Sequence, residues 1–233
     1  MIYQKKAWLA SYEKGVPPQI DYESKCLPEF LDQSAEEFPD RTALIFQGYR
    51  VSYREFKQMV DRFAAVLHHF GIAKGDRVAI LLPNLIPCVV AYFATIRLGA
   101  IVVMNNPLYT DRELKHQFND SNARLLITLD LLANRMIDLR PQTDLQQIVV
   151  TTLGDYLPFP KSILFPLVAK KKGLAATVKT ADNVYSYKKL LAQSLPPAPA
   201  SDLTFGDVSQ FQYTGGTTGV SKGVILTHGN LSK

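Results

Sequence analysis

The sequence predicts an α/β fold in which a parallel β-sheet is flanked by helices. Between residues 77 and 150, short apolar runs alternate with longer stretches of helical period. The apolar runs are hydrophobic at almost every position, as in VAILL at 78–82. Strands of this kind are buried on both faces, which is typical of a parallel sheet covered by helices on each side. Right-handed crossovers should connect them.

The chain ahead of this alternation predicts an arm and a first helix. Residues 1–26 show no regular period and are expected to form an irregular amino-terminal arm, which Trp8 and Tyr12 would attach to the body. A helix is predicted over 27–38, because apolar side chains recur there at helical spacing. Pro39 then ends it.

Two capping boxes mark the starts of later helices. In Ser52-x-x-Glu55 and in Thr110-x-x-Glu113, the hydroxyl can accept a hydrogen bond from the backbone three residues on, and the glutamate can reach back. The predicted elements after the first helix are, in chain order, a hairpin of strands 42–46 and 49–52, helix 53–70, strand 77–82, helix 85–98, strand 100–104, helix 111–118, strand 125–128, helix 131–139 and strand 147–150.

Residues 154–200 are less regular. The apolar run at 163–168 is followed by three lysines at 170–172. This pattern fits either contact with an anionic membrane surface or an exposed loop or short helix with a solvated lysine tail. We favour the second interpretation, since lipid-binding clusters usually hold about 4–8 basic residues. The proline-rich stretch LPPAPASD at 195–202 predicts a connector that delivers the chain to the next strand.

Composition sets broad limits on function. The 233 residues carry a net charge of +5, and the basic residues are spread along the chain. This charge is a weak argument for nucleic-acid binding, and it fits binding of an anionic small ligand or a membrane surface equally well. The two cysteines, Cys26 and Cys88, have no motif spacing and are expected to be free thiols in a reducing compartment. No His/Cys/Asp/Glu cluster has zinc spacing.

Targeting signals are also missing from the pattern. The start, MIYQKKAWLASYEKG, lacks the apolar region of a secretory signal. The most hydrophobic span, 85–104, is interrupted by Arg97 and Gly99, so a buried helix followed by a strand is favoured over a membrane span. We therefore expect a cytoplasmic protein, with peripheral contact at the inner face of the membrane left open.

The most informative stretch is YTGGTTGVSKG at 213–223. It holds four glycines, three threonines, one serine and one lysine. Glycines allow the backbone to approach a ligand closely, and successive backbone N–H groups can then surround an anion. Hydroxyls add donors and Lys222 adds positive charge. The composition predicts a phosphate-binding loop; the alternative is a plain glycine-rich hairpin turn, which needs only one or two such residues.

The flanks of this loop predict two strands. Residues 208–213 alternate in polarity, with Phe211 and Tyr213 on one face, and 223–227 is a second apolar, β-branched run. A Walker loop opens a helix and requires Gly-x4-Gly-Lys-[Ser/Thr], a spacing that Lys222 does not satisfy, and no G-x-G-x-x-G is present. There is no G-x-S-x-G motif to make a hydrolase nucleophile of a serine here.

The loop resembles the signature loop of the adenylate-forming superfamily, which includes acyl-CoA synthetases, aryl-CoA ligases, luciferases and peptide-synthetase adenylation domains. Its Thr214-Gly215-Gly216 opening is most similar to bacterial long-chain fatty acid–CoA ligases. The same resemblance extends from about Trp8 to the last residue. Its further long matches are KGDRVAILLPN at 74–84, NPLYTDRELKHQFNDSNARLLIT at 106–128 and DYLPFPK at 155–161.

The resemblance implies ATP-dependent activation of a long-chain fatty acid to an acyl-adenylate and then to acyl-CoA, with Mg²⁺ and coenzyme A as cofactor and second substrate. The loop would wrap the β- and γ-phosphates, with Thr217 and Thr218 donating hydrogen bonds and Lys222 balancing charge. No metal ligand and no catalytic residue is implied within these 233 residues, because the family's catalytic lysine belongs to a later segment. The implied phosphate-binding residues are Thr214, Gly215, Gly216, Thr217, Thr218, Gly219 and Lys222.

The resemblance also implies a domain organisation. The arm is 1–26, the first α/β subdomain of the AMP-binding domain is 27–200, and 201–233 starts the next segment with strand, phosphate loop and strand. The chain then corresponds to an amino-terminal portion of the ligase, without the remainder of the amino-terminal domain and without the carboxy-terminal domain. Such a portion is expected to be inactive alone.

Two alternatives stay open at this point. One is another adenylate-forming enzyme, either an aryl-CoA ligase or a peptide-synthetase adenylation domain. The other is an inert, truncated nucleotide-binding fold. The expected partners are fatty acid, ATP and CoA without nucleic acid, and a homodimer of the full-length protein is a further expectation. His116 is expected on the surface of its helix, and His228, in THGNL after the loop, has no implied catalytic role.

Overall fold

The computed structural model describes residues 6–214 and 221–233. A seven-stranded sheet forms the centre, in the order β7-β6-β5-β3-β4-β8-β9. Neighbouring strands are parallel except β8 and β9, which pair antiparallel, so the predicted parallel sheet is confirmed and an edge strand makes it mixed. The strands are β3 (Arg77–Leu81), β4 (Ile101–Met104), β5 (Leu125–Leu129), β6 (Gln147–Thr151), β7 (Val184–Ser186), β8 (Val208–Thr214) and β9 (Lys222–Thr227).

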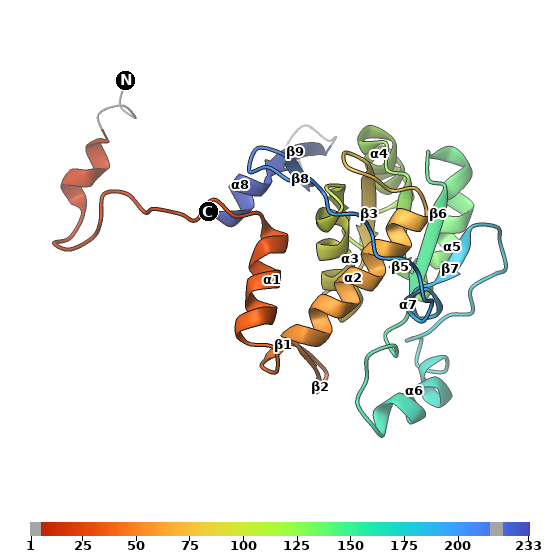
Figure 1. Cartoon of the computed structure of the whole chain (residues 1–233). Helices are drawn as coiled ribbons and strands as arrows, with labels where there is room; N and C mark the ends of the chain where they lie inside the picture. Colours follow the sequence, from red (N-terminus) through yellow and green to blue (C-terminus); the bar gives the residue numbers. More distant parts are fainter. Residues whose placement is uncertain (1–5, 215–220) are drawn as a thin grey trace.

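Helices cover both faces of this sheet (Figure 1). Residues of α1, α2, α3 and α7 pack in one hydrophobic cluster, and residues of α4 and α5 pack in the other. A separate antiparallel hairpin, β1 (Thr42–Phe46) with β2 (Tyr49–Ser52), packs beside α2. The helices are α1 (Leu27–Glu37), α2 (Tyr53–His69), α3 (Ile86–Arg97), α4 (Asp111–Ser121), α5 (Asp130–Leu139), α6 (Lys161–Ala169), α7 (Tyr187–Leu191) and α8 (His228–Ser232), with short 3-10 turns η2 (Ala7–Ser11) and η3 (Arg140–Gln142).

Strand β3 shows why its sequence is apolar at successive positions. Val78 and Ile80 point into the cluster under α2 and α3, whereas Ala79 and Leu81 point into the cluster under α4 and α5. All four side chains are fully buried. Because successive side chains of a strand face opposite sides of the sheet, a strand covered on both sides needs apolar residues throughout.

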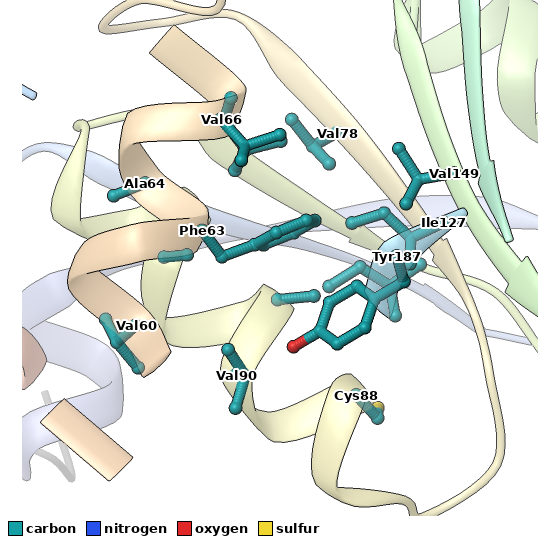
Figure 2. Close-up of a cluster of buried hydrophobic side chains, with 14 of the residues drawn as sticks. Val60, Phe63, Ala64, Val66, Val78, Cys88, Val90, Ile127, Val149 and Tyr187 are labelled. Carbon is teal, nitrogen blue, oxygen red and sulfur yellow. The ribbon is translucent and has the colours of Figure 1, made fainter. Parts of the chain in front are cut away.

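The centre of the first cluster is formed by aromatic rings from two helices. Figure 2 shows Phe63 of α2 and Tyr187 of α7 close together, with Ile127 and Val149 of the sheet beside them. The two ring centroids lie 4.9 Å apart, and both side chains are fully buried. The short segment β7–α7, which the sequence did not predict, therefore closes this face of the core.

Both capping boxes form as predicted. The Ser52 hydroxyl accepts from the backbone N–H of Glu55 at the start of α2, and the Thr110 hydroxyl accepts from that of Glu113 at the start of α4. Each glutamate accepts from the backbone N–H of its capping residue in return. These bonds fix where α4 begins, and hence which of its side chains face the β8–β9 hairpin.

The amino-terminal arm does not behave as expected. Trp8 and Tyr12 are 41% and 44% exposed, and the arm extends away from the main body (Figure 1). Because the arm does not lie against the body, the expected attachment through Tyr12 is wrong. Among the described residues, no helix is long and apolar enough to span a bilayer.

Candidate phosphate-binding hairpin

The predicted loop lies at the tip of the hairpin formed by β8 and β9. Residues 215–220, which include Gly215, Gly216, Thr217, Thr218 and Gly219 of the predicted site, lie outside the described part of the chain. Of the predicted site residues, the structure describes Thr214 and Lys222. These two are paired across the last register position of the hairpin, so they stand opposite each other at the base of the loop.

The hairpin tip is at the carboxyl edge of the sheet. Strand β8 runs parallel to β4, with Gln212 beside Met104, so both strands end at the same edge. The carboxyl ends of parallel strands are where open α/β sheets bind ligands. Lys222 is exposed, and among the described residues it forms no ion pair. A solvent-exposed ammonium without a carboxylate partner is available to an incoming anion.

Helix α4 holds the far end of the loop through Ser221. The Gln117 side-chain amide donates to Ser221 Oγ (3.3 Å) and accepts from Asn105 Nδ2 (2.7 Å). Asn105 directly follows β4 and is 3% exposed, and Gln117 is fully buried. A buried chain of amides thus links the end of a central strand to the end of the loop. The network is incomplete at one atom, because Asn105 Oδ1 is buried without a hydrogen-bond partner among the described residues.

His116 adds a second bond to the same residue. Its Nε2 lies 3.1 Å from the Ser221 carbonyl oxygen, and this bond requires the tautomer that carries the proton on Nε2. The imidazole also packs edge-on against the ring of Tyr213, with centroids 6.4 Å apart. The expectation of a surface histidine is therefore wrong: His116 is half-buried and contacts Tyr213 of β8 and Ser221, the residue before β9.

Tyr213 fixes the near end of the loop. Its hydroxyl donates to Asp120 Oδ2 of α4 (2.6 Å), and its side chain is 5% exposed. Burial, followed by the Asp120 carboxylate, raises the pKa of this phenol above its ordinary value. The facing Gly223 leaves room for the ring, because a Cβ there would come within 3.2 Å of Tyr213 Cζ. Side chains of one helix thus hold the residues on both sides of the predicted loop.

The opposite face of β8 carries a second polar row. The Tyr92 hydroxyl of α3 donates to Gln210 Oε1 (2.8 Å), and Gln210 Nε2 donates to Gln212 Oε1 (2.7 Å). Burial raises the pKa of Tyr92 to about 12, so its phenol stays protonated and can donate. The predicted alternation of β8 is confirmed, since Phe211 and Tyr213 pack in the cluster of α4 while the glutamines face α3.

The start of β8 is fixed by an ion pair. Lys74 Nζ lies 2.8 Å from Asp207 Oδ2, and that carboxylate also accepts from the Thr204 backbone N–H (2.7 Å). The Lys74 ammonium, followed by the Thr204 N–H, lowers the pKa of Asp207 to about 2. The backbone N–H of His228, the first residue of α8, donates to the Asp207 carbonyl oxygen (2.9 Å). The two ends of the hairpin are therefore tied together at this point.

His228 itself is a packing residue in this arrangement. Its side chain is fully buried, and neither ring nitrogen has a hydrogen-bond partner among the described residues. Burial lowers the pKa of the imidazole, which keeps it neutral at pH 7. The THGN sequence forms a capping box, in which the Thr227 hydroxyl accepts from the Asn230 N–H.

A metal ion would find few ligands here. In the parts of the chain that the structure describes, no group of three or more His, Cys, Asp or Glu side chains is arranged to hold one. The described residues therefore do not form a Mg²⁺ site by themselves.

Comparison with known proteins decides the family. The model of the AMP-binding enzyme family matches residues 31–233. The chain belongs to this family. The sequence resemblance is confirmed by the curated long-chain-fatty-acid–CoA ligases of Bacillus subtilis (strain 168), 40% identical over 230 residues, and of Salmonella typhimurium, 37% identical over 238 residues. Each alignment covers 97% of this chain but 41% of the relative, so the chain spans about two fifths of their length.

Solved structures agree on the fold. A long-chain-fatty-acid–CoA ligase from Archaeoglobus fulgidus matches 95% of this chain and 40% of its own with a TM-score of 0.73 at 26% identity. An anthranilate CoA ligase in complex with anthranoyl-AMP matches 88% of this chain and 35% of its own with a TM-score of 0.72 at 20% identity. The predicted fold, the amino-terminal part of an adenylate-forming synthetase, is thereby confirmed.

The supporting side chains of α4 were missed by sequence reasoning, although one signal was present. Leu114, Gln117, Phe118 and Ser121 lie on one face of α4 and are buried. Gln117 is thus a polar residue inside an apolar stripe, and such a residue needs a hydrogen-bond partner. The partner could not be identified from the chain, because Ser221 is 104 residues away.

Proposed function

We propose that this chain supplies the phosphate-binding part of an AMP-forming long-chain fatty acid–CoA ligase. The observation that supports it most strongly is the pairing of Thr214 with Lys222 at the carboxyl edge of the sheet, at the base of the glycine- and threonine-rich loop. Similarity to curated long-chain ligases over 97% of the chain supports the choice of acid. No residue of this chain is assigned to the acyl group or to coenzyme A.

The proposed reaction has two steps. In the first, a fatty acid carboxylate oxygen bonds to the α-phosphorus of ATP while the bond to the pyrophosphate oxygen breaks. In the second, the thiol sulfur of coenzyme A, having lost its proton, bonds to the acyl carbon and AMP leaves with the former carboxylate oxygen. Negative charge builds up on the departing pyrophosphate, so donors and cations fixed around it lower the barrier.

The described residues would act by holding those donors in place. Lys222 would pair with the β- and γ-phosphates, and Thr214 would donate its hydroxyl. The backbone and side chains of 215–219 would surround the same phosphates. Because Tyr213 and Ser221 are bonded to α4, the two residues that flank the loop would already be held in place when ATP binds. Bound Mg²⁺ would neutralise part of the phosphate charge, but the described residues provide no ligand set for it.

A panel of acids tests the substrate class. The intact protein is incubated with ATP, Mg²⁺ and coenzyme A, and thioesters are measured by mass spectrometry for long-chain fatty acids, benzoate-type acids and amino acids. We expect thioester from the long-chain acids. Product only from an aromatic acid, or adenylate only from an amino acid, would contradict the proposal and support one of the two alternative adenylating enzymes.

Location and assembly belong to the same proposal. Long acyl chains partition out of water, so we propose that the intact protein works peripherally at the inner face of the membrane, where its substrate gathers. The homodimer remains a prediction, which sedimentation velocity of the intact protein tests.

A further inference from the structure

Helix α6 presents an apolar surface that the core does not cover. Ile163, Leu164 and Leu167 are 62%, 54% and 70% exposed, and Phe159, just before the helix, is 79% exposed. Residues 163 and 167 are one helical turn apart, and 164 lies between them, so they form one stripe. Phe159, Ile163, Leu164 and Leu167 are called the α6 face below. Large apolar side chains gathered at a protein surface indicate an interaction site.

The side of α6 opposite the α6 face packs on the rest of the protein and fixes the direction in which the α6 face points. Phe165 packs on Gly154 so closely that a Cβ there would lie 2.6 Å from the ring, and Ala169 is fully buried. These contacts attach α6 to the loop after β6. In Figure 1 the helix stands apart from the layers that cover the sheet, below α7. The α6 face therefore points outward because its neighbours anchor the helix.

Lysines stand at both ends of the helix that carries the α6 face. Lys161 begins the helix, and Lys170, Lys171 and Lys172 follow it, all exposed. Two of these lysines donate to neutral groups: Lys161 to the Gln47 carbonyl oxygen and Lys170 to Thr177 Oγ1. No aspartate or glutamate occurs from 156 to 181. Counting Lys161 brings the cluster to the lower limit of the about 4–8 basic residues typical of anionic lipid binding.

We propose that the α6 face docks on an anionic phospholipid bilayer, with its apolar side chains at the acyl boundary and the lysines on the headgroups. The helix itself supplies the apolar side chains, and the lysines that would meet the headgroups stand at its two ends, at 161 and at 170–172. A second copy of the chain is disfavoured as the occupant, because symmetric pairing would bring two lysine clusters together. The inference deepens the peripheral location proposed above, and vesicle binding tests it without any substrate.

Vesicles with and without an anionic lipid test whether the lysines contribute to binding. The intact protein is mixed with phosphatidylcholine vesicles with or without phosphatidylglycerol, and the bound fraction is measured by flotation. We expect binding only with phosphatidylglycerol. Lys171→Gln with Lys172→Gln should weaken it by roughly 10- to 30-fold, since each lysine near the surface contributes about fivefold. Lys188→Gln with Lys189→Gln, an exposed pair on α7, is the matched control and should leave binding unchanged.

The apolar stripe is tested in the same assay. Ile163→Gln with Leu167→Gln should weaken binding by about tenfold or more, because both side chains leave the interface. Val16→Gln with Ile20→Gln, which are 49% and 59% exposed on the arm, is the control and should bind like the unmodified protein. Both positions of α6 are exposed, so folding should be retained.

Three results would overturn the proposal. They are equal binding to both kinds of vesicle, binding unaffected by both α6 variants, and absence of binding. If binding is absent while Ile163→Gln with Leu167→Gln converts a dimer to a monomer in sedimentation, the face is an interface between copies instead. None of these outcomes depends on fatty acid activation, so failure here leaves the ligase proposal standing.

Discussion

Asp207 connects the two ends of the candidate hairpin. Its carboxylate bonds Lys74 and the Thr204 N–H, and its carbonyl accepts from His228. The pKa of the carboxyl falls to about 2, against 3.8 for the ordinary group, because Lys74 and then the Thr204 N–H favour the charged form. A carboxyl whose folded-state pKa is depressed stabilises the fold above its unfolded pKa, and this contribution is lost as the pH falls towards the folded value.

Asp207→Asn is therefore expected to flatten the pH dependence of the free energy of unfolding between about pH 4 and pH 2. Urea unfolding at several pH values measures it. Burial lowers the pKa of His228, and its effect on stability below about pH 6.5 is common to the unmodified protein and both variants, so it cancels in the comparison. Asp40→Asn, which removes an exposed carboxylate paired with Arg54, is the control. If the two variants show the same slope, the Asp207 account is wrong.

At the scale of elements, α4 is the support for the candidate loop. His116, Gln117 and Asp120 contact Ser221 and Tyr213 on either side of it. The phase of the helix, and so the direction of these side chains, is set by the Thr110 capping box. Helix α2 begins with an equivalent box at Ser52 but packs on the opposite face of the sheet, which provides an internal comparison.

Thr110→Ala and Ser52→Ala should each lower the free energy of unfolding by about 1 kcal/mol, the usual cost of losing a capping hydroxyl. Of these two variants, Thr110→Ala should also weaken ATP binding, by roughly threefold to tenfold, because α4 contacts Tyr213 and Ser221 on either side of the loop and α2 packs on the opposite face of the sheet. Urea unfolding and calorimetry with ATP on the intact protein measure the two effects. Equal loss of ATP affinity in both variants would mean that the effect on the loop is a general consequence of lower stability.

The same elements show what the sequence could predict. Strands that are apolar throughout and the two capping boxes led to element boundaries that match the structure within a few residues, because local chemistry determines them. The segment β7–α7 was not predicted, since Val184–Ser186 is too short for a pattern and Tyr187 is buried by tertiary contacts, among them the ring of Phe63. The short exposed helix favoured for 163–168 is present as α6, but an apolar run alone did not reveal which of its side chains are covered.

In the molecule as a whole, the order of the strands brings the parts of the candidate site to one edge of the sheet. Strand β8 lies beside β4, although more than 100 residues separate them along the chain, and this places the loop and Asn105 at one edge. The sequence could place each residue after a strand, but it could not identify the strands as neighbours. Family membership and the sheet order together make the hairpin the expected phosphate site, while the boundaries 27–200 and 201–233 stay a prediction.

ATP–pyrophosphate exchange by the intact protein and by Lys222→Ala, with a long-chain fatty acid as substrate, tests whether this hairpin binds the phosphates of ATP during fatty acid activation. We predict exchange that depends on the fatty acid and that falls about 100-fold or more in the variant, the usual cost of removing one group that stabilises transition-state charge. Lys189→Ala, an exposed lysine of α7, serves as the control. Exchange that is unchanged in Lys222→Ala, or that needs no fatty acid, would contradict the account.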